Sequence, residues 1–296
     1  MNHGSLALRD GVLYVARGDV TARVRPYDLA GRPLGPGFEL RGAQGEPVAL
    51  GGIDVDADRQ VWVADAATNR VRTFSVFGRE SGGLAGADTR RDDARGALRA
   101  VTDVAVVESD DARLTLVASG GWRRHALQAF DANGACVESL RPNGSPLARF
   151  RGLTRIAARD GFVFACDAPV GVVQVFRSLE FHFAFRVAMR PGAKFEPVAI
   201  APLTGGRSVV AVRGEHAALL LVDGAGRLQR VLADRGSAAG EVDEPADVAV
   251  EASDGDRGAR LAVIDRDGER VQVFTLEGRC EGELTELPGR ASGAWE

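Results

Sequence analysis

A single pattern of strands and turns recurs along this 296-residue chain, and it constrains the fold more than any other feature. Its clearest copies are VWVADAATNRVRTF at 61–74 and LAVIDRDGERVQVF at 261–274. One position recurs at intervals of 46 to 54 residues, at Arg17, Asp65, Ser119, Asp167, Arg213 and Asp265. A third-strand position recurs in step with it, at Tyr27, Phe74, Phe130, Phe176, Val222 and Phe274. Two markers therefore give six repeats.

Each repeat predicts three short strands and a weaker fourth, separated by turns rich in Gly and Asp. A unit of this size with four antiparallel strands is typical of a propeller blade. We therefore expect an all-β fold, a single six-bladed β-propeller of four-stranded antiparallel blades. The expected blades are approximately 5–45, 46–98, 99–150, 151–195, 196–243 and 244–288, followed by a flexible tail at 289–296. We expect the ring to close by packing of the first blade on the sixth.

These residues resemble the NHL repeat, whose pattern combines V-x-V-A-D, a small polar loop and N-R-V-Q-V-F. The two copies quoted above match it closely, and FACDAPVGVVQVF at 164–176 matches it in part. The resemblance implies the same six-bladed propeller. It leaves function open, because NHL-type propellers include RNA binders, protein-interaction modules, sensor domains and a peptide-amidating lyase, and a fold does not fix an activity.

Charge and cysteine content narrow the class of partner. The 37 Lys and Arg residues against 41 Asp and Glu give a net charge of -4, so no global field favours DNA or a membrane surface. Almost every cation is arginine, with Lys194 the one lysine, which indicates a bacterial-like, GC-rich coding bias. The cysteines Cys136, Cys166 and Cys280 lack metal-ligand spacing. The N-terminus lacks a signal-peptide pattern, so we expect a cytoplasmic protein. We also expect a monomer that binds no cofactor and no metal.

Two Asp and Arg pairs flank the loop between the second and third strands. We interpret Asp65 with Arg70, and Asp265 with Arg270, as structural pairs that tie this loop. Arg17 and Arg213 stand at the same repeat position without a local acidic partner. This difference makes them candidates for contact with a binding partner.

The third repeat carries the run Trp122-Arg123-Arg124-His125 in the same loop. Trp and Arg are the residue types that dominate interface hot spots. We therefore predict a non-enzymatic scaffold that binds a protein partner through its loop face, at Arg17, Arg70, Trp122, Arg123, Arg124, His125 and Arg213. Single-stranded RNA on the same face is the alternative, because an aromatic side chain beside arginines also stacks bases.

An enzyme requires parts that the sequence does not supply. The four histidines are His3, His125, His182 and His216, and only two of them lie in comparable loops. GxSxG, HExxH and phosphate-loop motifs are absent. A metal-dependent propeller lyase or hydrolase is therefore the least favoured alternative, and we predict no catalytic residue.

Overall fold

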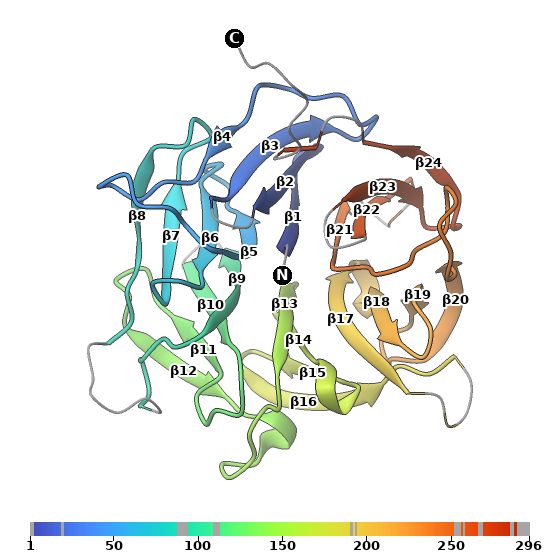
Figure 1. The fold of residues 1–296 in the computed structure, drawn as a ribbon. Helices are drawn as coiled ribbons and strands as arrows, with labels where there is room; N and C mark the ends of the chain where they lie inside the picture. The colour runs from blue at the N-terminus through green and yellow to red at the C-terminus, as the bar shows by residue number, and fades with distance from the viewer. Residues whose placement is uncertain are drawn as a thin grey trace.

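A computed structural model describes residues 3–18, 21–87, 94–108, 113–189, 192, 194–251, 256, 258–265, 269–284 and 287–288. Within these residues, the chain forms six sheets of four antiparallel strands, arranged as the blades of one ring (Figure 1). The prediction of a six-bladed all-β propeller is confirmed. The expected tail at 289–296 lies outside the described residues. Among the residues that are described, no helix is long and apolar enough to span a bilayer.

The strands follow chain order within every sheet. Blade 1 contains β1 (His3–Arg9), β2 (Val12–Gly18), β3 (Arg23–Asp28) and β4 (Phe38–Glu39). Blade 2 contains β5 (Leu50–Val55), β6 (Val61–Asp65), β7 (Arg70–Phe74) and β8 (Glu80–Leu84). Blade 3 contains β9 (Val101–Glu108), β10 (Arg113–Ser119), β11 (Leu127–Phe130) and β12 (Cys136–Leu140), followed by the short turn η1 (Pro142–Gly144).

The second half of the chain repeats this arrangement. Blade 4 contains β13 (Leu153–Arg159), β14 (Phe162–Asp167), the turn η2 (Ala168–Val170), β15 (Val172–Arg177) and β16 (Glu180–Arg186). Blade 5 contains β17 (Phe195–Pro202), the turn η3 (Thr204–Gly206), β18 (Ser208–Gly214), β19 (Ala218–Val222) and β20 (Leu228–Ala233). Blade 6 contains β21 (Asp247–Glu251), β22 (Arg260–Asp265), β23 (Arg270–Thr275) and β24 (Cys280–Glu283).

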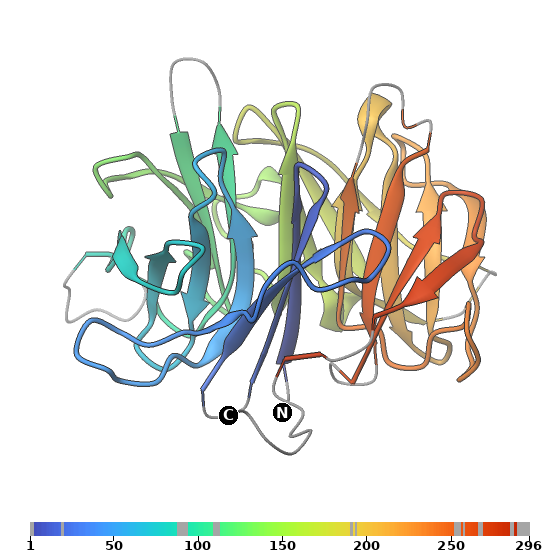
Figure 2. The ribbon, with the colours of Figure 1, turned by 90° about the horizontal axis from the view of Figure 1, so that it is seen from above.

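The first strand of each blade is the innermost, and these six strands surround the axis of the ring (Figure 1). The strands cross the ring from one face to the other (Figure 2). Two-residue turns such as Asp10-Gly11 return the chain from first to second strand, and both residues have positive φ, 50° and 74°. Such turns match the twist of an antiparallel pair. The opposite face, here called the loop face, carries the loops from second to third strand and the linkers between blades.

The apolar core lies between neighbouring blades, because each sheet buries both faces of its middle strands. Phe74 packs with Val24 and Val63 between blades 1 and 2, and equivalent aromatic side chains are buried in four other blades. Each large apolar side chain buried in this way contributes about 1.5–3 kcal/mol. The repeated aromatic position is therefore a packing position.

The acid at the end of the second strand orders the linker that enters its own blade. Asp65 accepts a hydrogen bond from the N–H of Ala49 at 3.3 Å. Asp167 accepts one from Gly152 at 2.8 Å, and Asp265 accepts one from Glu244 at 2.7 Å. Since a buried N–H requires an acceptor, the recurring Asp of the repeat is explained by the fold.

Among the described strands, none is shared between the two ends of the chain at the closure of the ring. β24 pairs with β23 of the same blade. Leu13 and Tyr27 of blade 1 pack with Ile264 and Val273 of blade 6 in one buried cluster. Closure therefore rests on the same blade-to-blade packing that joins the other neighbours.

Candidate functional site

Two arginines predicted to meet a partner donate hydrogen bonds to backbone carbonyls. Arg17 is buried at the seam between blades 1 and 6, where its Nη1 donates to the carbonyl of Pro288 at 3.2 Å. Arg213 is partly buried, and its guanidinium donates to the carbonyls of Pro245 and Glu244, the latter at 2.9 Å. Backbone carbonyls of the linkers thus stand where the local acid is missing. Burial removes Arg17 from the loop face, whereas contact of the partly buried Arg213 with a partner stays a prediction.

One of the two predicted structural pairs is also corrected. Asp265 contacts Arg270 at 2.6 Å, as expected. Asp65, however, contacts Arg72 at 2.9 Å, while Arg70 is exposed. Arg72 also contacts Glu46 at 2.8 Å and Glu80 at 2.9 Å. Arg72 therefore joins three strands of blade 2 to its entry linker, and Arg70 is no part of this network.

Trp122 is the most prominent apolar side chain on the loop face of blade 3, with 61% of its surface exposed. The guanidinium carbons of Arg149 and Arg151 lie 5.3 Å and 4.9 Å from the centre of its ring. These arginines belong to the linker into blade 4, and both are exposed. Leu147 of the same linker is 86% exposed. The structure thus gathers a cationic and apolar surface at this junction.

A groove of about 440 Å³ adjoins Arg149 and Arg151 and is also lined by Arg186 and Asp167. Arg186 donates to the carbonyl of Val170. Asp167 is the acid among these groups, but it is buried and already accepts N–H donors from Arg151 and Gly152. Desolvation raises its pKa, against the opposing effect of these hydrogen bonds. The groove therefore presents mainly positive charge.

The other residues of the predicted run have more local roles. Arg123 donates to the carbonyl of Gly120 at 3.1 Å. His125 Nδ1 lies 2.9 Å from Ser139 Oγ and 3.1 Å from Arg141 Nη2, so it ties the loop to the outer strand. Arg124 is exposed. Of the predicted loop-face residues, Trp122 is therefore the one with the strongest features of a contact residue.

A second polar cluster lies on the axis, where sequence reasoning predicted nothing. β13 and β1 face each other across the axis (Figure 1). Arg155 of β13 spans this distance, and its Nη2 donates to the carbonyl of Gly4 at 3.0 Å. Its Nε lies 3.2 Å from Asp247 Oδ2. The same carboxylate oxygen accepts the hydroxyl of Ser5 at 2.8 Å. This contact links β21 to β1 and so reinforces closure.

Asp103 lies beside this cluster and is 3% exposed. Its Oδ2 accepts the N–H of Ile156 at 2.7 Å, which joins β9 to β13. Desolvation raises the pKa of Asp103 to about 8; the charge of Arg155 opposes this rise and that of Asp247 adds to it. Desolvation likewise raises the pKa of Asp54 to about 6. Acids that titrate near neutrality are candidates for a functional role.

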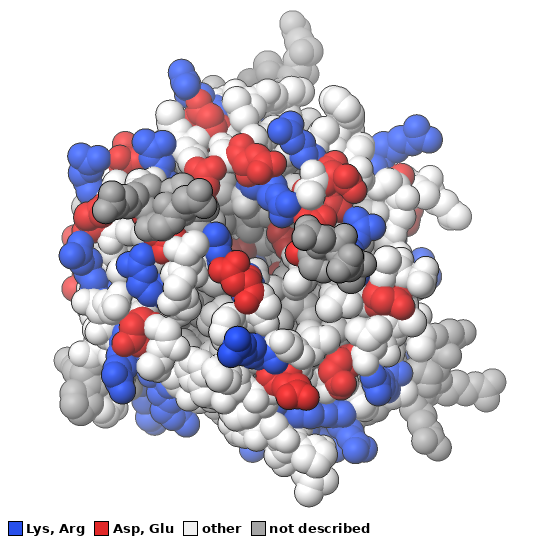
Figure 3. Space-filling view, turned by 180° about the vertical axis from the view of Figure 1, so that it is seen from behind, with Lys and Arg blue, Asp and Glu red and all other residues white. Residues whose placement is uncertain are grey.

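These inner strands enclose the axial cavity, a space of about 540 Å³ whose wall includes Asp54, Asp103, Arg155 and Asp247. It extends along the strands to the first-to-second strand turns, which are marked by Asp10 and Glu251. Figure 3 shows this face hollowed at its centre, with acidic and basic side chains around the opening. The size lies within the range of small-molecule sites.

The sequence held a signal for this cluster. The first strands read Asp103-Val-Ala, Arg155-Ile-Ala and Asp247-Val-Ala, which places a charged residue at a comparable point of three innermost strands. In a propeller these strands surround the axis.

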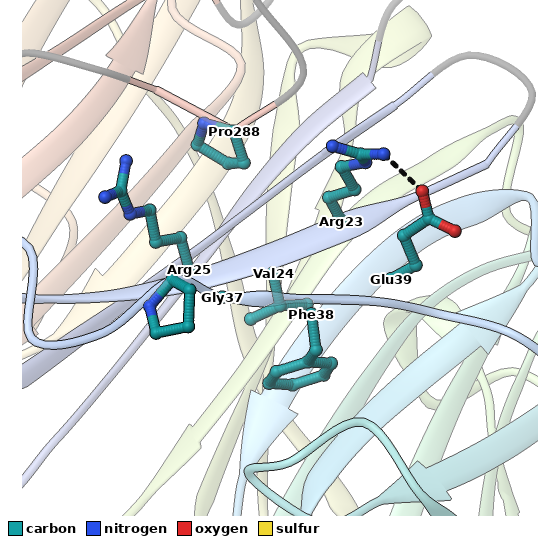
Figure 4. Close-up of a pocket in the computed structure, with 8 residues that line it drawn as sticks. Arg23, Val24, Arg25, Gly37, Phe38, Glu39 and Pro288 are labelled. Atoms are coloured by element: carbon teal, nitrogen blue, oxygen red, sulfur yellow. Dashed lines mark hydrogen bonds and ion pairs between the residues drawn. The ribbon is translucent and has the colours of Figure 1, made fainter. Parts of the chain in front are cut away.

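A third cavity, of about 220 Å³, lies at the seam near Arg23, Arg25, Phe38 and Pro288 (Figure 4). Arg23 pairs with Glu39 in its wall. Arg25 Nε donates to the carbonyl of Gly35 at 3.0 Å. Since these contacts stabilise the outer part of blade 1, we interpret this cavity as a packing feature.

No group of three His, Cys, Asp or Glu side chains able to hold a metal ion occurs among the described residues. Asp54, Asp103 and Asp247 of the axial cavity come from separate blades. Each accepts a hydrogen bond from a backbone N–H group. This arrangement differs from the convergent oxygen ligands that a divalent ion takes.

No family model matches the chain. No curated protein matches it either. Among solved structures, a streptogramin B lyase aligns with a TM-score of 0.57 and 11% identity, covering 97% of this chain and 83% of that chain. Virginiamycin B lyase from Staphylococcus aureus aligns with a TM-score of 0.59 and 10% identity, covering 97% and 85%. The WD40 β-propeller domain of Doa1 aligns with a TM-score of 0.56 and 15% identity, covering 92% and 78%. At these identities the likeness shows the propeller fold alone.

Proposed function

We propose that this chain is a non-enzymatic binding propeller that docks an acidic segment of a partner protein on its loop face. The proposed contact region, here called the blade 3–4 surface, comprises Trp122, Leu147, Arg149, Arg151 and Arg186. One observation carries the proposal: an indole that is 61% exposed lies under two guanidinium groups beside a groove.

The composition of this surface fits a binding hot spot. Trp and Arg are enriched where truncation of a side chain weakens binding by 2 kcal/mol or more. Leu147 adds an aliphatic side chain that is 86% exposed. The surface lies on loops held by a stack of sheets, so little ordering entropy opposes binding.

The charge of the surface selects the class of partner. Arg149, Arg151 and Arg186 line the groove, and its acid, Asp167, is already hydrogen bonded. The chain as a whole is acidic, with a net charge of -4. A negatively charged segment is therefore attracted to this surface and repelled by much of the remainder. A peptide with both acidic and apolar side chains would satisfy the arginines and also cover Trp122 and Leu147.

The test uses labelled peptides of defined sequence and fluorescence anisotropy. The probe alternates Glu with Leu, and its control replaces each Glu by Gln. We expect the acidic peptide to bind and the neutral peptide to bind at least tenfold more weakly. Trp122→Ala should weaken binding about tenfold to thirtyfold, the change expected for loss of a hot-spot side chain. Phe77→Ala is the matched control, because Phe77 is 88% exposed on blade 2.

Three outcomes would overturn the proposal. Equal binding of both peptides would show that charge does not select the partner. Equal weakening by the Trp122 and Phe77 variants would show that the peptide does not bind at the blade 3–4 surface. Tighter binding of oligouridylate, with affinity falling steeply as salt rises, would assign the surface to single-stranded RNA.

A lyase is the second candidate function, because two of the similar structures are lyases and the axial cavity contains Asp103. Its pKa of about 8 suits proton exchange near neutral pH. Incubation of the purified protein with a streptogramin B, followed by mass spectrometry, tests this candidate. Unchanged substrate removes it.

A further inference from the structure

The axial cavity holds more acidic groups than basic ones. The charged residues of its wall are the acids Asp10, Asp54, Asp103, Asp247 and Glu251 and the bases Arg9, Arg155 and Arg159. Two of these bases pair elsewhere: Arg9 contacts Glu108 at 3.1 Å, and Arg159 contacts Asp160 at 3.6 Å. Arg155 is thus the base of the wall that lies among the buried acids, where it pairs with Asp247 and its charge acts on Asp103.

The donors of Arg155 are largely used. Nη2 donates to the carbonyl of Gly4 at 3.0 Å, and Nη1 lies 3.4 Å from the carbonyl of Thr154. Its Nε contacts Asp247. Within the described residues, no arginine or lysine lies within ion-pair distance of Asp103 or Asp54, whose hydrogen-bond donors are backbone N–H groups. Two carboxyl groups in the wall therefore lack an ion pair, and Arg155 and Arg9 act on Asp103 and Asp54 only from beyond that distance.

A carboxylate removed from water without a counter-ion is unfavourable. Two events relieve the difficulty: the acid takes up a proton, or a cation enters the cavity. Burial raises the pKa of Asp103 to about 8, which is the first of these responses. A bound cation would supply the second.

We propose that the axial cavity is a binding site for a small organic cation, an alkylammonium or alkylguanidinium compound, whose charge contacts Asp103 and Asp54. The innermost strands pair within their sheet on one side only, so their free edges present backbone C=O as well as N–H groups. These carbonyls accept hydrogen bonds from an ammonium or guanidinium group. The volume of about 540 Å³ leaves room for a short organic body as well.

Other ligand classes fit less well. An anion would approach Asp103 and Asp247, while the charge of Arg155 is already paired with Asp247 and its Nη2 donates to Gly4. A metal ion requires several convergent ligands, and the described part of the chain offers no group of three. The excess of acid over base thus favours an organic cation.

The test compares four probes by isothermal titration calorimetry: n-propylammonium, n-propylguanidinium, propionate and calcium chloride. We expect saturable binding of at least one of the two organic cations and none of propionate or calcium. Asp103→Asn should weaken this binding at least tenfold. The substitution removes the charge but retains an oxygen that accepts the N–H of Ile156. Glu180→Gln is the matched control, because it removes one exposed acid from the outer strand β16.

The dependence on pH gives a second readout. Arg155, Asp247 and Cys166 are the charged and titratable groups that interact with Asp103. Because the cation displaces the proton of Asp103, affinity should rise by up to about tenfold per unit between pH 6 and 8. Above pH 7, where Asp54 with its pKa of about 6 is already largely ionised, this rise should be absent in Asp103→Asn. If that variant does not fold, Asp54→Asn provides the loss-of-charge test at pH 8.

The proposal fails if neither organic cation binds at pH 8.5, or if Asp103→Asn binds as tightly as the unaltered protein. Preferential binding of calcium would assign the cavity to a metal instead. Preferential binding of propionate would assign it to an anion. None of these results depends on the blade 3–4 surface.

Discussion

Replacement of Asp103 by Asn should change the stability of the propeller in a way that depends on pH. Asp103 is 3% exposed, and its carboxyl group accepts the N–H of Ile156 at 2.7 Å. Asn retains an acceptor of nearly the same shape. The substitution therefore removes the ionisable group while leaving the contact between β9 and β13 in place.

The magnitude follows from the pKa of about 8 in the folded state. An unfolded Asp titrates near 4, so the native state holds a proton that the unfolded state has lost between these two values. The stability from the protonated acid is complete below about pH 4 and is lost as the pH rises through about 8. At about 1.4 kcal/mol per unit, the total loss is roughly 5 kcal/mol. The Asn variant does not undergo this loss.

The assay is urea denaturation of both proteins, without added organic cation, at intervals from pH 5.5 to 8.5. Groups that do not interact with Asp103 titrate alike in the two proteins, so the difference between their unfolding free energies reports on Asp103 and its direct neighbours. The variant should gain roughly 3 kcal/mol or more over the unaltered protein across this range. A difference that stays constant with pH would refute the reasoning, because it would show that Asp103 is ionised in the folded state.

Three further predictions test the other buried groups. Arg155→Met should lower the free energy of unfolding by roughly 3–5 kcal/mol in urea denaturation, since it leaves a buried carboxylate without its guanidinium; a loss below about 1 kcal/mol would contradict this. Arg72→Met should cost about 3 kcal/mol, whereas Arg70→Met should change stability by less than about 0.5 kcal/mol, and equal effects would contradict the pairing described above. Burial raises the pKa of the Cys166 thiol, so maleimide should label Cys136 in the native protein and Cys166 only after unfolding, as mass spectrometry would show; rapid native labelling of Cys166 would contradict its burial.

The fold was predictable because it depends on features that repeat. The position marked by Phe74 is aromatic in five of the six blades, and the position marked by Asp65 is acidic in three of them. Each performs the same task wherever it occurs, the first in packing and the second in ordering a linker. Because the same structural task recurs in successive blades, the same residue types recur in the sequence. The repeat can therefore be recognised even where one blade departs from it.

The pairing of Asp65 shows why contacts are harder to predict than strands. Asp65 and Arg70 are directly opposite in the register of β6 and β7, which favours their pairing. Arg72 lies two residues further along the same strand, where it reaches Asp65 together with Glu46 and Glu80. Burial decides between the two arginines, since a guanidinium inside the protein requires several acceptors. That number of acceptors depends on the entry linker, which local spacing does not reveal.

Both candidate binding regions arise from contacts between blades. Trp122 receives its guanidinium groups from the next linker rather than from the arginines beside it in sequence. Arg155 reaches across the axis to Gly4, a residue 151 positions away. A residue that makes a contact between blades can differ from one blade to the next, provided that the packing positions that hold the ring together are retained. Residues that differ from the repeat at otherwise equivalent positions are therefore where a function specific to this chain is expected, and Trp122, Asp103 and Arg155 belong to this class.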